Sequence, residues 1–125
     1  METNLNNVQQ EVDTGNDSIV IMQYIDGIPG GRSLDTTGFT ETVIKAGHVV
    51  IKDSDGVYKP MPVADGAYDD LPDGSSYVGV VQASVLTERP MAGIMIRGKV
   101  NEVASPYAVT AAIKTALPHI IFTED

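Results

Sequence analysis

The chain has 125 residues, of which 17 are acidic and 8 are basic, and it contains no cysteine. This length fits one domain with one buried core, and the missing cysteines exclude disulfides, thiolate nucleophiles and cysteine-ligated zinc. The formal net charge of −9 repels phosphate, and the basic residues are scattered singly, so we expect no nucleic-acid partner. Since no apolar run approaches the ~18 residues that a membrane-spanning helix needs, we expect no membrane partner either.

Residues 1–17 are polar and acidic, with frequent asparagine and glutamine and no lysine or arginine. The only large apolar residues after the initiator methionine are Leu5, Val8 and Val12. Such a segment cannot bury enough surface to offset the entropy of ordering. We therefore predict a flexible N-terminal arm over residues 1–17 and a single β-rich domain over residues 18–125. Two interpretations stay open: a tail without a role, or an arm that becomes ordered on a partner.

Residues 19–25 (IVIMQYI) are almost wholly apolar and rich in residues that favour strands. They predict a strand that is buried on both faces, or covered on one face by a partner. Residues 26–38 (DGIPGGRSLDTTG) follow, and their glycines and proline predict an irregular loop with positive φ in the Gly-Gly pair. Ile19 and Ile21 are therefore candidates for partner contact beside the predicted arm.

A β-hairpin is predicted within residues 46–63 (AGHVVIKDSDGVYKPMPV). The segment His48–Asp53 alternates, which puts Val49 and Ile51 on one face of a strand. The DSDG sequence is typical of a turn, because Asp and Ser bond their own backbone and Gly accepts positive φ. The returning strand, Val57–Val63, holds two prolines that cannot donate a hydrogen bond, so we expect it at a sheet edge.

The next part of the chain predicts a loop and two more strands. Residues 64–76 (ADGAYDDLPDGSS) are typical of a long acidic loop. Residues 77–86 (YVGVVQASVL) and 91–101 (MAGIMIRGKVN) predict the strands, joined by a turn at residues 87–90 (TERP).

One short helix is predicted near the C-terminus, over residues 107–116 (YAVTAAIKTA). Ser105 suits its N-cap and Pro106 its first position. Residues 119–122 (HIIF) predict a closing strand. The sequence thus predicts a mainly β fold, a compact sandwich or small irregular β-barrel, with one short helix near the C-terminus and a flexible N-terminal arm.

Few residues of the chain can carry chemistry. His48 lies beside valines on a predicted strand and His119 lies in the closing segment, so we expect both to be surface or half-buried residues without a catalytic role. The stretches 53–56 and 69–74 are rich in Asp, but they lack the ligand spacing of an EF-hand loop and are typical of turns. We therefore predict that the chain is not an enzyme and holds no metal or cofactor.

The order of these features resembles a known family. A polar arm is followed by residues 46–63, by YVGVVQASV (77–85) and by MAGIMIRGKVNEVA (91–104), then by a short helix and a closing β segment. The most specific stretch is IMIRGKVNEVA, residues 94–104. This order resembles the head decoration proteins of tailed bacteriophages, the lambda-type capsid-stabilising proteins, over roughly residues 40–122.

The resemblance implies a structural protein of the virion. Proteins of this family form trimers on the outer capsid surface, where they bind the major capsid protein and stabilise the shell against the pressure of packaged DNA. The arm would become ordered on the shell, and the candidate capsid-binding residues are Leu5, Val8, Val12, Ile19 and Ile21. Since residues 1–17 have neither a basic leader nor an apolar stretch, we expect no signal peptide and synthesis in the host cytoplasm.

A second interpretation stays open. The chain would then be a head-fibre base, or a receptor- or glycan-binding module of the virion. Its contacts would come from the acidic loop, residues 64–76, and from exposed Tyr68 and Tyr77.

Overall fold

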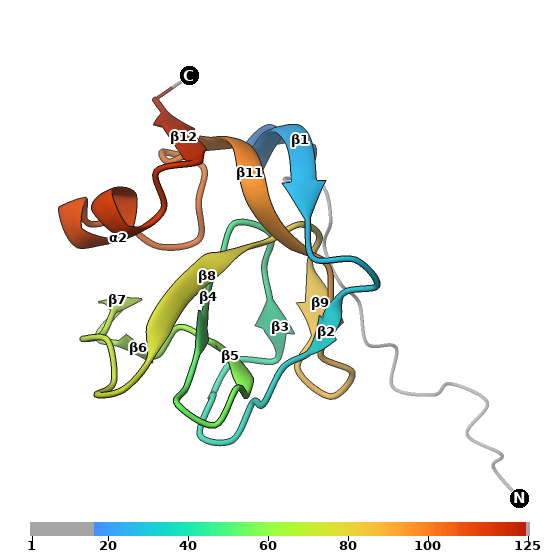
Figure 1. The fold of residues 1–125 in the computed structure, drawn as a ribbon, viewed down its shortest axis with the longest axis vertical. Coiled ribbons are helices and arrows are strands. Elements are labelled where there is room, and N and C mark those ends of the chain that lie inside the picture. The colour runs from blue at the N-terminus through green and yellow to red at the C-terminus, as the bar shows by residue number, and fades with distance from the viewer. Residues whose placement is uncertain (1–16, 125) are drawn as a thin grey trace, which may run out of the picture.

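The computed structural model describes residues 17–124, which form a mainly β fold (Figure 1). In this range the chain forms twelve strands and two short helices. The predicted mainly β fold with a short helix near the C-terminus is confirmed. The strands form one large sheet and three two-stranded sheets, and they do not close into a barrel. The predicted flexible arm falls on residues 1–16, which lie outside the described residues, and on Asp17.

A six-stranded sheet organises the domain. Its order is β1 (Ile21–Gly27), β11 (Ile94–Asn101), β8 (Ser76–Val81), β4 (Val49–Lys52) and β5 (Tyr58–Pro60), with β12 (Ile120–Thr123) also paired to β11. All pairs in this sheet are antiparallel except β11 with β12, which is parallel. β11 therefore pairs with three other strands.

The sheet has a hydrophobic core on each face, because apolar side chains occupy both faces of its central strands. On β4, Val49 and Ile51 belong to the first core and Val50 to the second, so the predicted alternation is confirmed. The helices α1 (Asp17–Val20) and α2 (Ala111–Ala116) cover the first core, each through one buried residue.

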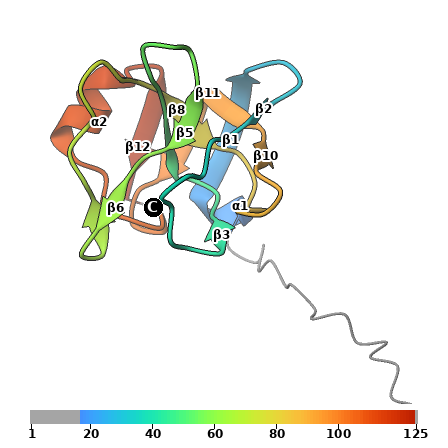
Figure 2. The same ribbon diagram turned by 90° about the horizontal axis from the view of Figure 1, so that it is seen from below.

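Small sheets and loops cover the second core. The pairs are β2 (Arg32–Ser33) with β10 (Met91–Ala92), and β3 (Val43–Ile44) with β9 (Val85–Leu86). Leu34, Ile44 and Ala92 come from these segments and are buried in the second core. Figure 2 shows α2 and β10 on opposite sides of the molecule.

The predicted hairpin of β4 and β5 is confirmed. The carboxylate of Asp53 accepts hydrogen bonds from the backbone N–H groups of Asp55 (2.9 Å) and Val57 (3.0 Å). These bonds, the one from Val57 above all, hold the pKa of Asp53 below its ordinary value. Gly56 has φ 83°, as the turn requires. The strand that holds Pro60 lies at the edge of the sheet, as predicted.

The helix α2 begins later than predicted. Its N-cap is Thr110, whose hydroxyl accepts a hydrogen bond from the backbone N–H of Ile113 (3.4 Å). The predicted start at Tyr107, with Ser105 as the cap, is wrong. Ser105 instead donates its hydroxyl proton to the carbonyl of Asn101 (3.0 Å), which ties it to the turn after β11.

Three other segments differ from the prediction in detail. Residues 77–86 divide into β8 and β9, and residues 91–101 divide into β10 and β11. The acidic loop contains a small hairpin, in which β6 (Val63–Ala64) pairs with β7 (Ala67–Tyr68). Two consecutive residues with positive φ, at 65 and 66, make its turn.

The apolar segment 19–25 is not the buried strand that its composition predicts. Residues up to Val20 belong to α1, which also places Asp17 in the domain and not in the arm. The strand begins at Ile21, and from Met22 to Asp26 its side chains are exposed. An apolar run without alternation predicts burial only if other elements cover the strand, and nothing in residues 17–124 covers β1 on both faces.

We predict that Gly79→Ala destabilises the fold by about 1–3 kcal/mol, the usual cost of an overpacked core. A Cβ at Gly79 would collide with the backbone carbonyl oxygen of Met95, so β8 and β11 would have to separate. Gly93→Ala is the matched control, because its Cβ would meet only the flexible side chain of Gln82. Urea unfolding measures the free energy of unfolding of both variants. If Gly79→Ala and Gly93→Ala lose the same amount, the prediction is wrong.

Candidate functional site

An exposed apolar strip lies at the N-terminal end of the described chain. Eight large hydrophobic side chains are exposed among the described residues. Four of them come from one short segment: Ile19, Met22, Tyr24 and Ile25, each between 46% and 55% exposed. We call these four residues the apolar strip. Scattered exposed hydrophobics are ordinary, whereas four within residues 19–25 make this segment the candidate for an interaction surface.

The strand β1 that carries most of the strip has an unpaired edge. Within residues 17–124 it pairs only with β11 and lies at the end of the sheet. Its register shifts three times, between Ile21 and Gln23 and on each side of Asp26. Such shifts are bulges, which turn side chains away from regular alternation. Bulges at a sheet edge limit strand addition, so the backbone N–H and C=O groups that β1 offers to a partner strand lie between the shifts, with apolar side chains beside them.

The exposed surface continues onto the neighbouring strands. Gln23 of β1 lies opposite Lys99 of β11, which in turn lies beside Ile121 of β12, and all three are exposed. The hydroxyl of Thr123 lies 3.1 Å from the sulfur of Met22, so the end of β12 contacts the strip. The surface beside the strip thus consists of side chains from three neighbouring strands, and the basic side chain of Lys99 lies on the middle strand, β11.

The candidate capsid-binding residues fall in three different places. Leu5, Val8 and Val12 lie outside the described residues. Ile19 is exposed and belongs to the strip, whereas Ile21 is half-buried and packs against the first core. Sequence reasoning did not single out the other three members of the strip, although they stand in the same apolar run. The composition of this apolar run pointed to these residues, but only the structure shows that they are exposed.

His48 is buried, and the prediction of a surface or half-buried residue is wrong. Its Nε2 donates a hydrogen bond to the carbonyl of Met61 (3.0 Å). Phe39, Tyr68 and Tyr107 surround the imidazole with ring edges, at centroid distances of 5.4, 5.3 and 5.7 Å. Burial lowers the pKa of His48 to about 4, so the ring is neutral at pH 7. These contacts give His48 a structural role, since it joins segments that are distant in the sequence.

The two tyrosines that the second interpretation requires are not freely exposed. The hydroxyl of Tyr68 accepts a hydrogen bond from the backbone N–H of Val49 (3.0 Å), and burial raises the pKa of Tyr68 above its ordinary value. Tyr77 is half-buried and packs against the first core. The expectation that Tyr68 and Tyr77 are exposed is therefore wrong, and the acidic loop offers fewer aromatic contacts for a glycan than predicted.

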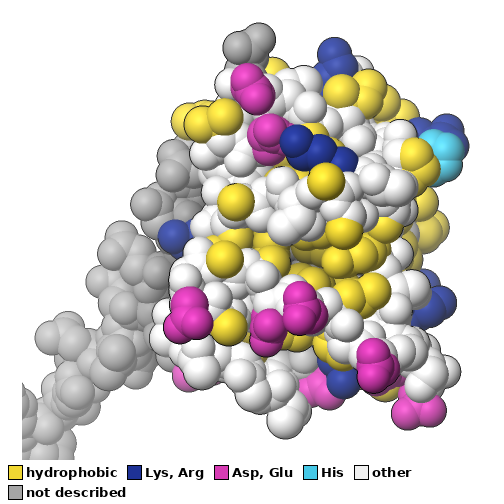
Figure 3. All heavy atoms as spheres, turned by 90° about the vertical axis from the view of Figure 1, so that its left-hand side faces the viewer, with side chains coloured by type: hydrophobic (Ala, Val, Ile, Leu, Met, Phe, Trp, Pro, Cys, Tyr) yellow, Lys and Arg dark blue, Asp and Glu magenta, His cyan; other side chains and the backbone are white. Residues whose placement is uncertain are grey.

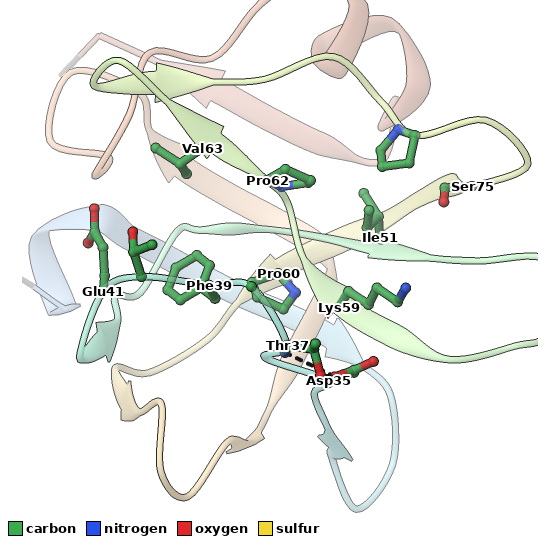
Figure 4. Close-up of a pocket in the computed structure, with 13 residues that line it drawn as sticks. Asp35, Thr37, Phe39, Glu41, Ile51, Lys59, Pro60, Pro62, Val63 and Ser75 are labelled. Atoms are coloured by element: carbon green, nitrogen blue, oxygen red, sulfur yellow. Dashed lines mark hydrogen bonds between the residues drawn. The ribbon is translucent and has the colours of Figure 1, made fainter.

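A hollow of about 240 Å³ lies between the loop at residues 35–41 and the segment that follows β5 (Figure 4). Its charged groups are each paired within the fold. Asp35 accepts a hydrogen bond from the hydroxyl of Thr37 (2.6 Å), which is the main reason that the pKa of Asp35 is lowered. Lys59 forms an ion pair with Asp53 (3.3 Å), and Glu41 accepts a hydrogen bond from Tyr107. Each of the three charged side chains that line the hollow thus already has a partner within the fold.

Neither metal-binding clusters nor long apolar helices are found in the part of the chain that the structure describes. Residues 17–124 contain no group of three or more His, Cys, Asp and Glu side chains that would hold an ion. None of the helices in this range has the length and apolar character needed to cross a membrane. On the face in Figure 3, which carries α2 and β7, basic side chains lie apart from one another among acidic and apolar ones.

Comparisons of the chain with protein-family models, curated proteins and solved structures gave no match. The resemblance to phage decoration proteins therefore stays a prediction.

We predict that His48 makes the fold sensitive to acid. The pKa of His48 is about 4 in the folded protein and about 6.5 in an unfolded chain. As the pH falls, the unfolded state takes up the proton first, so stability falls as the pH drops below 6.5 and towards 4. Between pH 7 and pH 5 this residue should cost about 2 kcal/mol of unfolding free energy.

Urea unfolding at pH 7 and pH 5 measures the loss. His48→Gln keeps a donor for the Met61 carbonyl but does not titrate, so its loss over this range should be about 2 kcal/mol smaller. His119→Gln, at an exposed histidine, serves as the control for the substitution itself. An equal loss in His48→Gln and the unmodified protein would contradict the prediction.

Proposed function

We propose that the protein is a decoration protein of a tailed-bacteriophage head. It binds the outer surface of the shell through its N-terminal region and stabilises the shell against the pressure of the packaged DNA. The observation that carries the proposal is the apolar strip on a strand with a free edge. The resemblance in the sequence supplies the kind of partner, the major capsid protein.

The geometry supports docking by strand addition. A partner strand that pairs with the free edge of β1 gains backbone hydrogen bonds, and side chains on both strands set the register. Complete burial of a large apolar side chain contributes about 1.5–3 kcal/mol. The four side chains of the strip are already about half buried, so covering them adds roughly half that amount for each. In the proposal, Leu5, Val8 and Val12 add further contacts from the arm.

Charge and symmetry fit a site outside the shell. The net charge of −9 repels the phosphates of packaged DNA. We propose a homotrimer on the capsid, as the resemblance implies, and its closed cyclic symmetry would let copies associate without open-ended growth. Three strips in one trimer would bind together, so a modest affinity for each strip becomes a tight attachment.

Removing apolar side chains from the strip should weaken binding. In Tyr24→Ser/Ile25→Ser, the lost burial of two half-covered side chains should raise the dissociation constant for each site roughly 10- to 150-fold. The free protein also loses the buried half of the two side chains, at most about 1.5–3 kcal/mol of unfolding free energy, so binding is measured at a temperature at which thermal unfolding shows the variant to be folded. Co-sedimentation with shells assembled from the major capsid protein of the same phage measures the binding.

Met91→Ser provides the matched control. Met91 is also an exposed apolar residue, at 61%, but it lies on β10 and outside the strip. Its substitution should leave the binding unchanged. If the two strip substitutions and the control reduce binding equally, or if the unmodified protein does not bind shells, the proposal is wrong.

A further inference from the structure

The short helix α1 is tied to the body of the domain by side-chain hydrogen bonds. The carboxylate of Asp17 accepts one bond from the backbone N–H of Ser84 (2.9 Å) and one from the hydroxyl of Ser84 (2.7 Å). The hydroxyl oxygen of Ser84 accepts a third bond, from the backbone N–H of Ala46 (3.0 Å). Three segments that are far apart in the sequence therefore meet at one half-buried point.

A second contact holds the other end of the same helix. Val20 is buried in the first core, and its side chain lies directly over Gly47. A Cβ at Gly47 would collide with the side chain of Val20, and Gly47 also has φ +88°, which favours glycine. Asp17 and Val20 are three residues apart and face the body of the domain, while Ile19 between them is exposed. We call the group Asp17, Val20, Gly47 and Ser84 the anchor.

The anchor residues Asp17 and Val20 stand directly before β1 and flank Ile19, the first residue of the strip. A helix of four residues is not stable alone in water, so the shape of α1 depends on these contacts. β1 begins at the next residue, Ile21, and its outer edge has no partner strand among the described residues. The anchor thus fixes the start of a strand whose side chains from Met22 to Asp26 are largely uncovered.

We infer that Asp17 and Ser84 are positioning residues for partner binding. They hold Ile19 and β1 in the binding conformation before the partner arrives, so the partner does not have to order this segment. A segment that is ordered in advance binds more tightly with the same contacts, because the entropy has already been lost in folding. The inference rests on the proposed function, since it assumes that the strip is the surface that binds the shell.

The test uses the full chain and shells of the major capsid protein. Asp17→Ala, which removes both bonds, should weaken binding about tenfold. Ser84→Ala keeps the bond from the backbone N–H of residue 84 and should weaken binding by a smaller factor, although neither variant alters a residue of the strip. The double variant should bind about as well as Asp17→Ala, because that variant has already lost both bonds between the two residues. Ser84→Ala also controls for charge, since it removes the hydroxyl bond to Asp17 without removing a carboxylate. Ser18→Ala, at an exposed position of the same helix, should bind like the unmodified protein.

Two further measurements separate positioning from a general loss of stability. Hydrogen exchange in the free variants should speed up at residues 18–26 and stay unchanged in β4 and β8. Ser84→Thr, which keeps the hydroxyl, should restore the slow exchange and the affinity. Binding is measured at a temperature at which thermal unfolding shows each variant to be folded.

The outcomes distinguish the inference from the proposed function. If the unmodified protein binds shells and the variants Asp17→Ala and Ser84→Ala bind them with the same affinity as it does, the positioning role is wrong and the proposed function stands. If exchange speeds up throughout the domain, the contact supports the whole fold, and the positioning role is again wrong. If the unmodified protein does not bind shells, the proposed function itself fails.

Discussion

The strand β11 pairs with β1, β8 and β12, and so it joins the N-terminal segment, the centre of the sheet and the closing strand. Its side chains enter both cores, with Ile94 in the second and Met95 in the first. The close approach of β11 to β8 and to β1 depends on glycine, because a Cβ at Gly79 or Gly98 would collide with the backbone of a neighbouring strand. β1 is held in place by β11 and by the anchor, while no strand within residues 17–124 pairs with its outer edge.

Local signals in the sequence predicted local structure well. The hairpin at Asp53 forms because the turn residues bond their own backbone, and this needs no distant partner. The start of α2 was predicted wrongly, because Ser105 has the pattern of a cap but bonds to Asn101. The burial of His48 was missed for a related reason, since its aromatic neighbours come from segments whose meeting no local pattern reveals.

The apolar strip shows most clearly what the sequence could and could not predict. The run IVIMQYI indicated either a buried strand or a strand covered by a partner. The choice depends on what the rest of the chain places against β1, and the described residues cover little of it. In the proposed function the partner supplies that cover, and the well-packed two-sided sheet serves as a rigid support for it.

Hydrogen exchange of the unmodified protein, free and bound to shells, tests this account most directly. If a capsid strand adds to the open edge, the amides of residues 21–26 should exchange more slowly on the shell. Those of β5, at the opposite edge of the sheet, should not change. Binding that leaves residues 21–26 unprotected, or that protects β5 instead, would contradict the claim that the protein docks through β1.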